Sequence, residues 1–169
     1  MGAAFFYHLT QTSLENTLPM LIAKSREKGW RIEVRGQDAD RMAQLDVALW
    51  RGPDDSFAPH GIAGGPHDAD QPVLLTTGAG AANAPACLMA VHGADVTADE
   101  VSALARTCIL FDGLDADAVA HARTQWKALT DAGCAAPLFT SARISVSSIS
   151  PKATVLRRTL ATSTGPLAV

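Results

Sequence analysis

The best candidates for metal chemistry in this 169-residue sequence are two histidines and two nearby aspartates. His60, His67, Asp68 and Asp70 all carry side chains that bind metal ions. Their spacing fits neither an i, i+4 helical pair nor a turn-based zinc motif, and no nearby cysteine completes a set of four ligands. We therefore predict no metal site and expect these histidines to be solvated or hydrogen-bonded locally.

A glycine-containing segment, Gly78-x-Gly80-x-x-Asn83, follows an apolar run and is similar to part of a dinucleotide-binding turn. Such a turn needs a helix directly after it, because the first N–H groups of that helix face the phosphate. Here a second apolar run, 87–91, follows, and the third glycine of the pattern is missing. The segment predicts a flexible hairpin loop, and a small Rossmann-like nucleotide-binding enzyme is the alternative.

Nucleophilic and acid–base catalysis also lack a recognisable motif. No serine lies in a Gly-x-Ser-x-Gly turn between a strand and a helix. The paired carboxylates Asp54 and Asp55 follow Pro53 in a turn, where aspartate is common for conformational reasons. We expect a chain that is not an enzyme by itself and that needs no cofactor.

Two aromatic features suggest protein binding instead. The first is a predicted helix that ends in Trp50, followed by a loop that carries Phe57, Pro59 and His60. Aromatic side chains on a rigid support are typical anchors of protein interfaces. The alternative is that Phe57 folds back onto the core.

The second feature is one face of the last predicted helix, where Arg123, Trp126 and Lys127 occupy an arc of about 100°. Two cations beside a large aromatic ring suit an acidic peptide that also buries a hydrophobic side chain. A solvated helix face with Trp126 turned inwards is an equally good interpretation.

The elements that position these residues alternate between strand and helix. Hydrophobic periodicity predicts strands at about 3–9, 30–35, 72–77, 85–91 and 107–111, and helices that begin near 13, 39, 99 and 116. The second strand should be half exposed, Pro19 should kink or break the first helix, and one apolar stripe should join Met42, Leu45, Leu49 and Trp50. This alternation predicts a single α/β domain with a mostly parallel sheet flanked by helices.

Composition narrows the function further. The net charge of −3 argues against strong direct binding to nucleic acid. No Lys or Arg lies between Arg51 and Arg106, so the acidic and basic parts of the chain should meet different partners. Cys87 and Cys108 lie in apolar runs, which favours buried thiols in a reducing compartment. No signal peptide or membrane-spanning run is recognisable, so we expect a cytoplasmic protein with no membrane contact.

The aromatic features coincide with a family resemblance. The run 45–50, Leu-Asp-Val-Ala-Leu-Trp, and the following Phe57-Ala58-Pro59-His60 resemble a signature of the chi subunit of bacterial DNA polymerase III. The opening 6–9 and the pattern Arg123-x-x-Trp126-Lys127 resemble the same family, and the similarity covers residues 3–134 in order.

The resemblance implies a Rossmann-like fold without a nucleotide site. It also implies a non-catalytic accessory subunit that binds the acidic C-terminal tail of single-stranded DNA-binding protein and links it to the clamp-loader or a helicase. Arg123, Trp126 and Lys127 match the tail-binding positions, although Val119 stands where the family can have a lysine. Trp50, Phe57, Pro59 and His60 match the surface for a psi subunit or helicase.

The end of the chain departs from the family. After Gly133 the sequence becomes rich in serine, threonine and arginine and has no clear periodicity. We therefore expect a chi-like domain at 1–134 and an atypical, mostly disordered segment at 135–169.

Overall fold

The computed structural model describes residues 2–52, 58–137 and 140–141, and these form an α/β fold. The elements in chain order are β1 (Ala4–Leu9), α1 (Leu14–Glu27), β2 (Ile32–Arg35), α2 (Ala39–Trp50), β3 (Gly61–Ile62), the 3-10 turn η1 (Asp68–Asp70), β4 (Val73–Thr76), β5 (Cys87–Ala90), α3 (Ala98–Ala103), β6 (Arg106–Asp112), α4 (Ala116–Asp131) and β7 (Thr140–Ser141). The strands form one sheet in the order β3-β4-β2-β5-β6-β1-β7, and all of these pairings are parallel. The predicted α/β class with a parallel sheet is confirmed.

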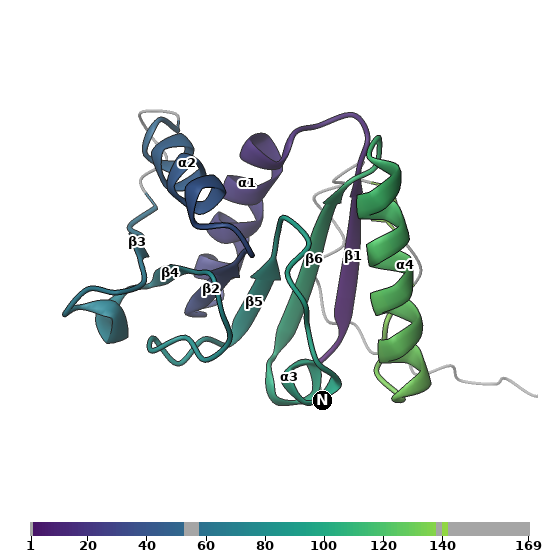
Figure 1. Cartoon of the computed structure of the whole chain (residues 1–169). Helices are drawn as coiled ribbons and strands as arrows, with labels where there is room; N and C mark the ends of the chain where they lie inside the picture. The colour runs from purple at the N-terminus through teal and green to yellow at the C-terminus, as the bar shows by residue number, and fades with distance from the viewer. Residues whose placement is uncertain (1, 53–57, 138–139, 142–169) are drawn as a thin grey trace, which may run out of the picture.

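Helices cover both faces of the sheet and bury two separate apolar clusters (Figure 1). The first cluster joins α1 and α2 to one face, with Leu18 and Leu45 against strand residues such as Val34. The second joins α3 and α4 to the other face, with Leu129 against Phe6. Cys87 and Cys108 are buried free thiols, as the apolar runs around them predicted. Among the described residues, no helix is long and apolar enough to cross a membrane.

The second strand was predicted to be half exposed, and this is wrong. β2 lies inside the sheet between β4 and β5, and all four of its residues are buried. The alternation of Glu33 and Arg35 with apolar residues is real, but both charged side chains point to a buried face where they pair with each other. Nor does Pro19 break the first helix, because α1 runs through it for 14 residues.

The segment Gly78–Asn83 is not a hairpin loop, because β4 and β5 do not pair with each other. Both pair in parallel with β2, one on each side, so residues 77–86 carry the chain back to the amino ends of the strands. The buried Asn83 secures this connection, since its Nδ2 donates to the carbonyls of Ile32 (3.0 Å) and Gln71 (3.1 Å). The prediction failed because strands that follow each other along the chain usually, but not always, lie side by side.

The sheet continues past the predicted boundary at residue 134. Ala135 forms a parallel bridge with Ala3, and β7 pairs with Tyr7 and His8 of β1. The first residues of the predicted atypical segment therefore join the sheet. Residues 138–139 and 142–169 of that segment lie outside the described residues.

Candidate functional site

The last helix is positioned by a strong cap and a narrow apolar face. The Asp115 side chain accepts a hydrogen bond from the backbone N–H of Asp117 (2.9 Å), as expected for an acidic residue at a helix start. Ala122, Gln125 and Leu129 form the buried face of α4. The opposite surface is left to solvent, and the predicted tail-binding residues lie on it or at its margin.

The structure brings Arg123, Trp126 and Lys127 together on α4 but gives them different surroundings. Arg123 is exposed, and it makes no ion pair with any residue that the structure describes. Trp126 is half-buried against the second apolar cluster, and its indole Nε1 donates to the carbonyl of Ala136 at 3.1 Å. The tryptophan is therefore anchored to the segment that follows α4, with only part of its ring accessible.

Lys127 already has an acidic partner. Its Nζ lies 2.6 Å from Oδ2 of Asp131, one turn further along the helix, and both side chains are largely exposed. The hydrogen bond to Asp131 raises the pKa of Lys127. An incoming carboxylate would have to compete with Asp131 for this cation. Val119, one turn before Arg123, packs against the second apolar cluster and adds no positive charge.

Trp50 at the end of α2 and the loop residues Pro59 and His60 form a surface that we call the ledge, and its centre is the buried side chain of His60. Trp50 was predicted to lie on the apolar stripe of this helix, but its exposed fraction is 54%. Its ring stands 4.4 Å from the buried ring of His60, centroid to centroid. His60 contacts the carbonyl oxygen of Ala58 through Nδ1 (2.7 Å) and a carboxylate oxygen of Asp46 through Nε2 (3.4 Å).

His60 thus packs against the ring of Trp50 and is itself too buried to contact a partner protein. Pro59 is half-buried in the same loop, and Phe57 lies outside the described residues. Two further apolar side chains, Val47 of α2 and Ile62 of β3, are about half exposed. The ledge therefore consists mainly of Trp50, with apolar neighbours that the sequence pattern did not single out.

A cavity of about 710 Å³ opens at the carboxyl ends of β1, β5 and β6. Its wall includes the turn 10–13 before α1, Arg41 of α2, His92 after β5, and Asp112 and Asp115 before α4. Sequence reasoning missed this site. The available signal was that polar residues directly follow three buried strands, since the carboxyl ends of parallel strands meet at one edge.

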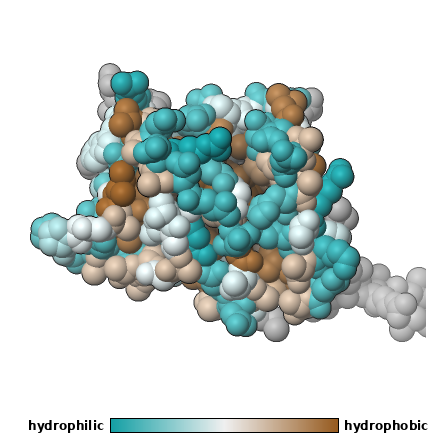
Figure 2. All heavy atoms as spheres, viewed as in Figure 1, coloured by the Kyte–Doolittle hydropathy of each residue, from teal (hydrophilic) through white to brown (hydrophobic). Residues whose placement is uncertain are grey.

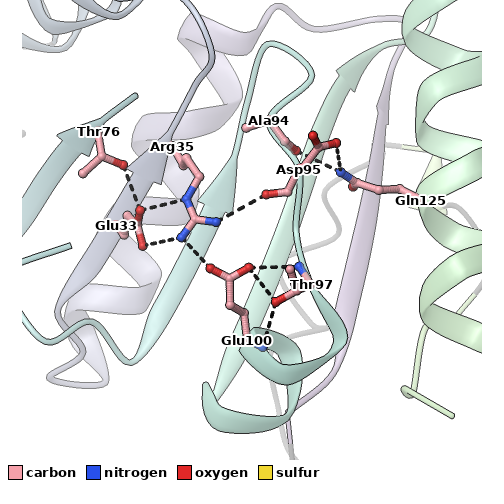
Figure 3. A network of polar contacts seen from close by, with 8 residues as sticks. All are labelled: Glu33, Arg35, Thr76, Ala94, Asp95, Thr97, Glu100 and Gln125. Carbon is pink, nitrogen blue, oxygen red and sulfur yellow. Dashed lines mark hydrogen bonds and ion pairs between the residues drawn. The ribbon is translucent and has the colours of Figure 1, made fainter. Parts of the chain in front are cut away.

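A polar network crosses the sheet from β2 to α3 (Figure 3). Arg35 makes two hydrogen bonds to the Glu33 carboxylate (2.9 and 3.1 Å), and its Nη2 lies 2.7 Å from Oε1 of Glu100. Thr76 donates to Glu33 at 2.8 Å, and Thr97 caps α3 in a reciprocal arrangement with Glu100. The polar groups of this network are hydrogen-bonded to one another, which indicates a structural role.

The residues first considered for metal and nucleotide chemistry have different surroundings in the structure. His60 is buried beneath Trp50, and His67 precedes the turn η1 on the surface. Within residues 2–52, 58–137 and 140–141, no three His, Cys, Asp or Glu side chains lie close enough to hold a metal ion. Gly78–Asn83 is followed by the strand β5, so it lacks the helix start that faces the phosphate in a dinucleotide-binding turn.

The comparison with protein families gives a match over most of the chain. The family described as DNA polymerase III chi subunit, HolC, matches residues 1–137 of the chain. This match covers the whole described sheet except β7, together with α4 and the ledge at the end of α2. No curated protein matches the chain.

Proposed function

The chain belongs to the DNA polymerase III chi subunit family, and from this premise we propose that it binds the acidic C-terminal tail of single-stranded DNA-binding protein through α4. Membership of the family makes it a replication accessory subunit of the DNA polymerase III complex. In our proposal the subunit is non-catalytic and links the tail to the clamp-loader or a helicase.

The observation that carries the proposal is the α4 surface formed by Arg123, Trp126 and Lys127. Arg123 offers a guanidinium that no described carboxylate occupies, and the accessible edge of Trp126 lies one turn away. An acidic tail that ends in phenylalanine needs both a cation and an apolar contact. Burying that phenylalanine would contribute roughly 1.5–3 kcal/mol.

The binding energy from charge is modest and depends on salt. Exposed ion pairs are screened by counterions, and each one contributes little. Lys127 contributes only when the tail displaces Asp131. We therefore expect micromolar affinity, which permits exchange during replication.

The ledge at Trp50 is the proposed contact for a psi subunit or helicase. His60 fixes the tryptophan ring, and the half-exposed Val47 and Ile62 add apolar surface. Aromatic anchors of this kind often dominate the energy of an interface. The ledge is formed by α2 and the chain after it, whereas the tail surface is on α4, so one subunit could hold both partners at once.

The test is a titration of the full chain with an acidic peptide that ends in phenylalanine. Arg123→Ala should weaken binding about two- to fivefold, as expected for one exposed charge pair. Arg26→Ala is the matched control, because it removes an exposed arginine from α1 on the other face of the sheet. If Arg123→Ala bound the peptide as tightly as the wild type, the tail would bind elsewhere. The same conclusion would follow if Arg26→Ala weakened binding as much as Arg123→Ala.

A further inference from the structure

The described sheet ends beside the cavity at its carboxyl edge. β7 runs parallel to β1, and its last residue, Ser141, lies opposite His8. The next two residues of the chain after His8, Leu9 and Thr10, form part of the cavity wall. The chain therefore passes into its C-terminal segment, residues 142–169, one strand away from the cavity and at the same edge of the sheet.

Carboxylates outnumber cations on the described wall of this cavity. Glu15, Asp112 and Asp115 are exposed, and none of them forms an ion pair with a residue that the structure describes. Arg41 brings one opposing charge to the wall. Burial, followed by the charge of Arg41, lowers the pKa of His92, so this imidazole is neutral at physiological pH. Three carboxylates therefore face one guanidinium, which favours a cationic ligand.

The cavity also presents apolar surface. The buried residues Leu9, Ile109 and Phe111 line it at the ends of β1 and β6. Leu114, between the two aspartates of the wall, is 80% exposed. Figure 2 shows hydrophobic residues between the hydrophilic ones on this side of the molecule. A ligand that matches this surface needs aliphatic side chains next to positive charges.

The C-terminal segment has the complementary composition. It contains no Asp or Glu, and its cations are Arg143, Lys152, Arg157 and Arg158. The whole chain has a net charge of −3 and this segment has +4, so residues 1–141 carry −7. The run 155–160, Val-Leu-Arg-Arg-Thr-Leu, places two adjacent arginines between aliphatic residues. Charge and hydrophobicity therefore match between the cavity and this run.

We propose that residues 155–160 of the chain's own C-terminal segment bind in this cavity. Arg157 and Arg158 pair with carboxylates of the wall, and the leucines of the run cover the apolar surface. Hydrogen bonds between a guanidinium and a carboxylate are stronger than those between neutral groups, and their fork geometry adds specificity. The occupant is thus a basic, apolar peptide, and it is supplied by the same molecule.

The connection is long enough for this contact. Thirteen residues, 142–154, separate β7 from the run 155–160. An extended chain spans about 3.4 Å per residue, so they can cover up to about 45 Å. A ligand joined to its site by a short linker has an effective concentration of about 1 mM. A contact with a Kd of about 0.1 mM is then formed in about nine-tenths of the molecules.

This inference goes beyond the binding of an acidic tail and uses a different flank of α4. Ala118 and Ala122 line the cavity. Trp126, on the proposed surface for the acidic tail, instead donates to Ala136. A failure of one site therefore says nothing about the other, and Arg123→Ala should leave occupation of the cavity unchanged.

The test is calorimetric titration of the full chain with a synthetic peptide of residues 152–162. In the wild type the chain's own segment competes with the peptide. The peptide should therefore bind the wild type about tenfold more weakly than a full chain that carries Arg157→Ser and Arg158→Ser. In that double variant, the further change Glu15→Gln should weaken the peptide about two- to fivefold, as expected for one exposed ion pair.

Glu27→Gln in the same double variant is the matched control, because it removes an exposed carboxylate from the other end of α1. Equal peptide affinity of the wild type and the double variant would overturn the proposal. An equal effect of Glu15→Gln and Glu27→Gln would overturn it as well, since the peptide would then bind outside the cavity. The titration is repeated after about tenfold dilution of the wild-type chain. Peptide affinity that rises on dilution would assign the competing segment to a second copy and contradict binding within one molecule.

Discussion

Replacing Arg35 by methionine tests whether the polar network in Figure 3 is a structural element. The side chains of Arg35 and Glu33 are only 7% and 3% exposed, so the substitution leaves a buried carboxylate without its cation. Glu33 then keeps one described partner, the hydroxyl of Thr76. Breaking a buried ion pair in this way typically costs about 3–5 kcal/mol. Folding free energies of single domains are about 5–15 kcal/mol, so the loss should be large.

Urea unfolding followed by circular dichroism measures this loss. The double variant Glu33→Gln with Arg35→Met should be at least about 1 kcal/mol more stable than the single Arg35→Met, because it carries no unpaired buried charge at position 33. Arg26→Met is the control. Its one described hydrogen bond, to the Trp30 carbonyl, is on the surface, so the expected change is within about 0.5 kcal/mol. A loss below about 1 kcal/mol for Arg35→Met would refute the reasoning.

The same network sets a pH dependence. Burial acts to raise the pKa of Glu100, but the hydrogen bonds from Arg35 and Thr97 outweigh it and lower the pKa. A carboxyl group with a depressed folded-state pKa stabilises the protein above its unfolded value of about 4.5. This contribution is lost as the pH falls through the folded-state pKa. In the double variant Glu33→Gln with Arg35→Met, which has no unpaired carboxylate at position 33, the unfolding free energy should therefore depend less on pH between about 3 and 5 than in the wild type.

Two further substitutions test the connections that position the sheet and the tail surface. Asn83→Ala removes two buried hydrogen bonds from the crossover between β4 and β5, and should lower the unfolding free energy in urea by about 1–3 kcal/mol. An unchanged free energy would mean that the crossover is not secured by this side chain. Trp126→Phe keeps an aromatic ring but loses the bond to the Ala136 carbonyl, so a loss of about 0.5–1.5 kcal/mol is expected. No loss at all would contradict a tie between α4 and the segment after it.

The local sequence pattern predicted most of the helices and strands, but it did not predict the order of the strands in the sheet. The capped start of α4 at Asp115 and the apolar run of β6 were visible because each depends on neighbours in the sequence. The position of β2 between β4 and β5 depends on pairing between distant segments, which no local pattern encodes. For the same reason, the sequence pattern did not identify Glu33 and Arg35 as a buried pair. Their alternation with apolar residues is ordinary for a half-exposed strand.

The candidate sites were predictable to a similar degree. Helical spacing correctly placed Arg123 close to Trp126 and Lys127, because all three belong to one helix. Spacing could not show that Asp131 already holds Lys127 or that the indole of Trp126 is bonded to Ala136. The cavity escaped notice because its wall combines segments from positions 9 to 122.

The distribution of charge indicates which contribution would dominate the proposed tail binding. The chain carries a net charge of −3, and one of the two cations on α4 is already paired with Asp131. Long-range attraction for an acidic tail is therefore weak, and the exposed Arg123 acts mainly over short distances. In the proposed complex, affinity would then come largely from the apolar contact at Trp126, while the cations would select the acidic sequence and its orientation. The half-buried, hydrogen-bonded tryptophan suits this role, because a ring that is already fixed loses little entropy when a partner packs against it.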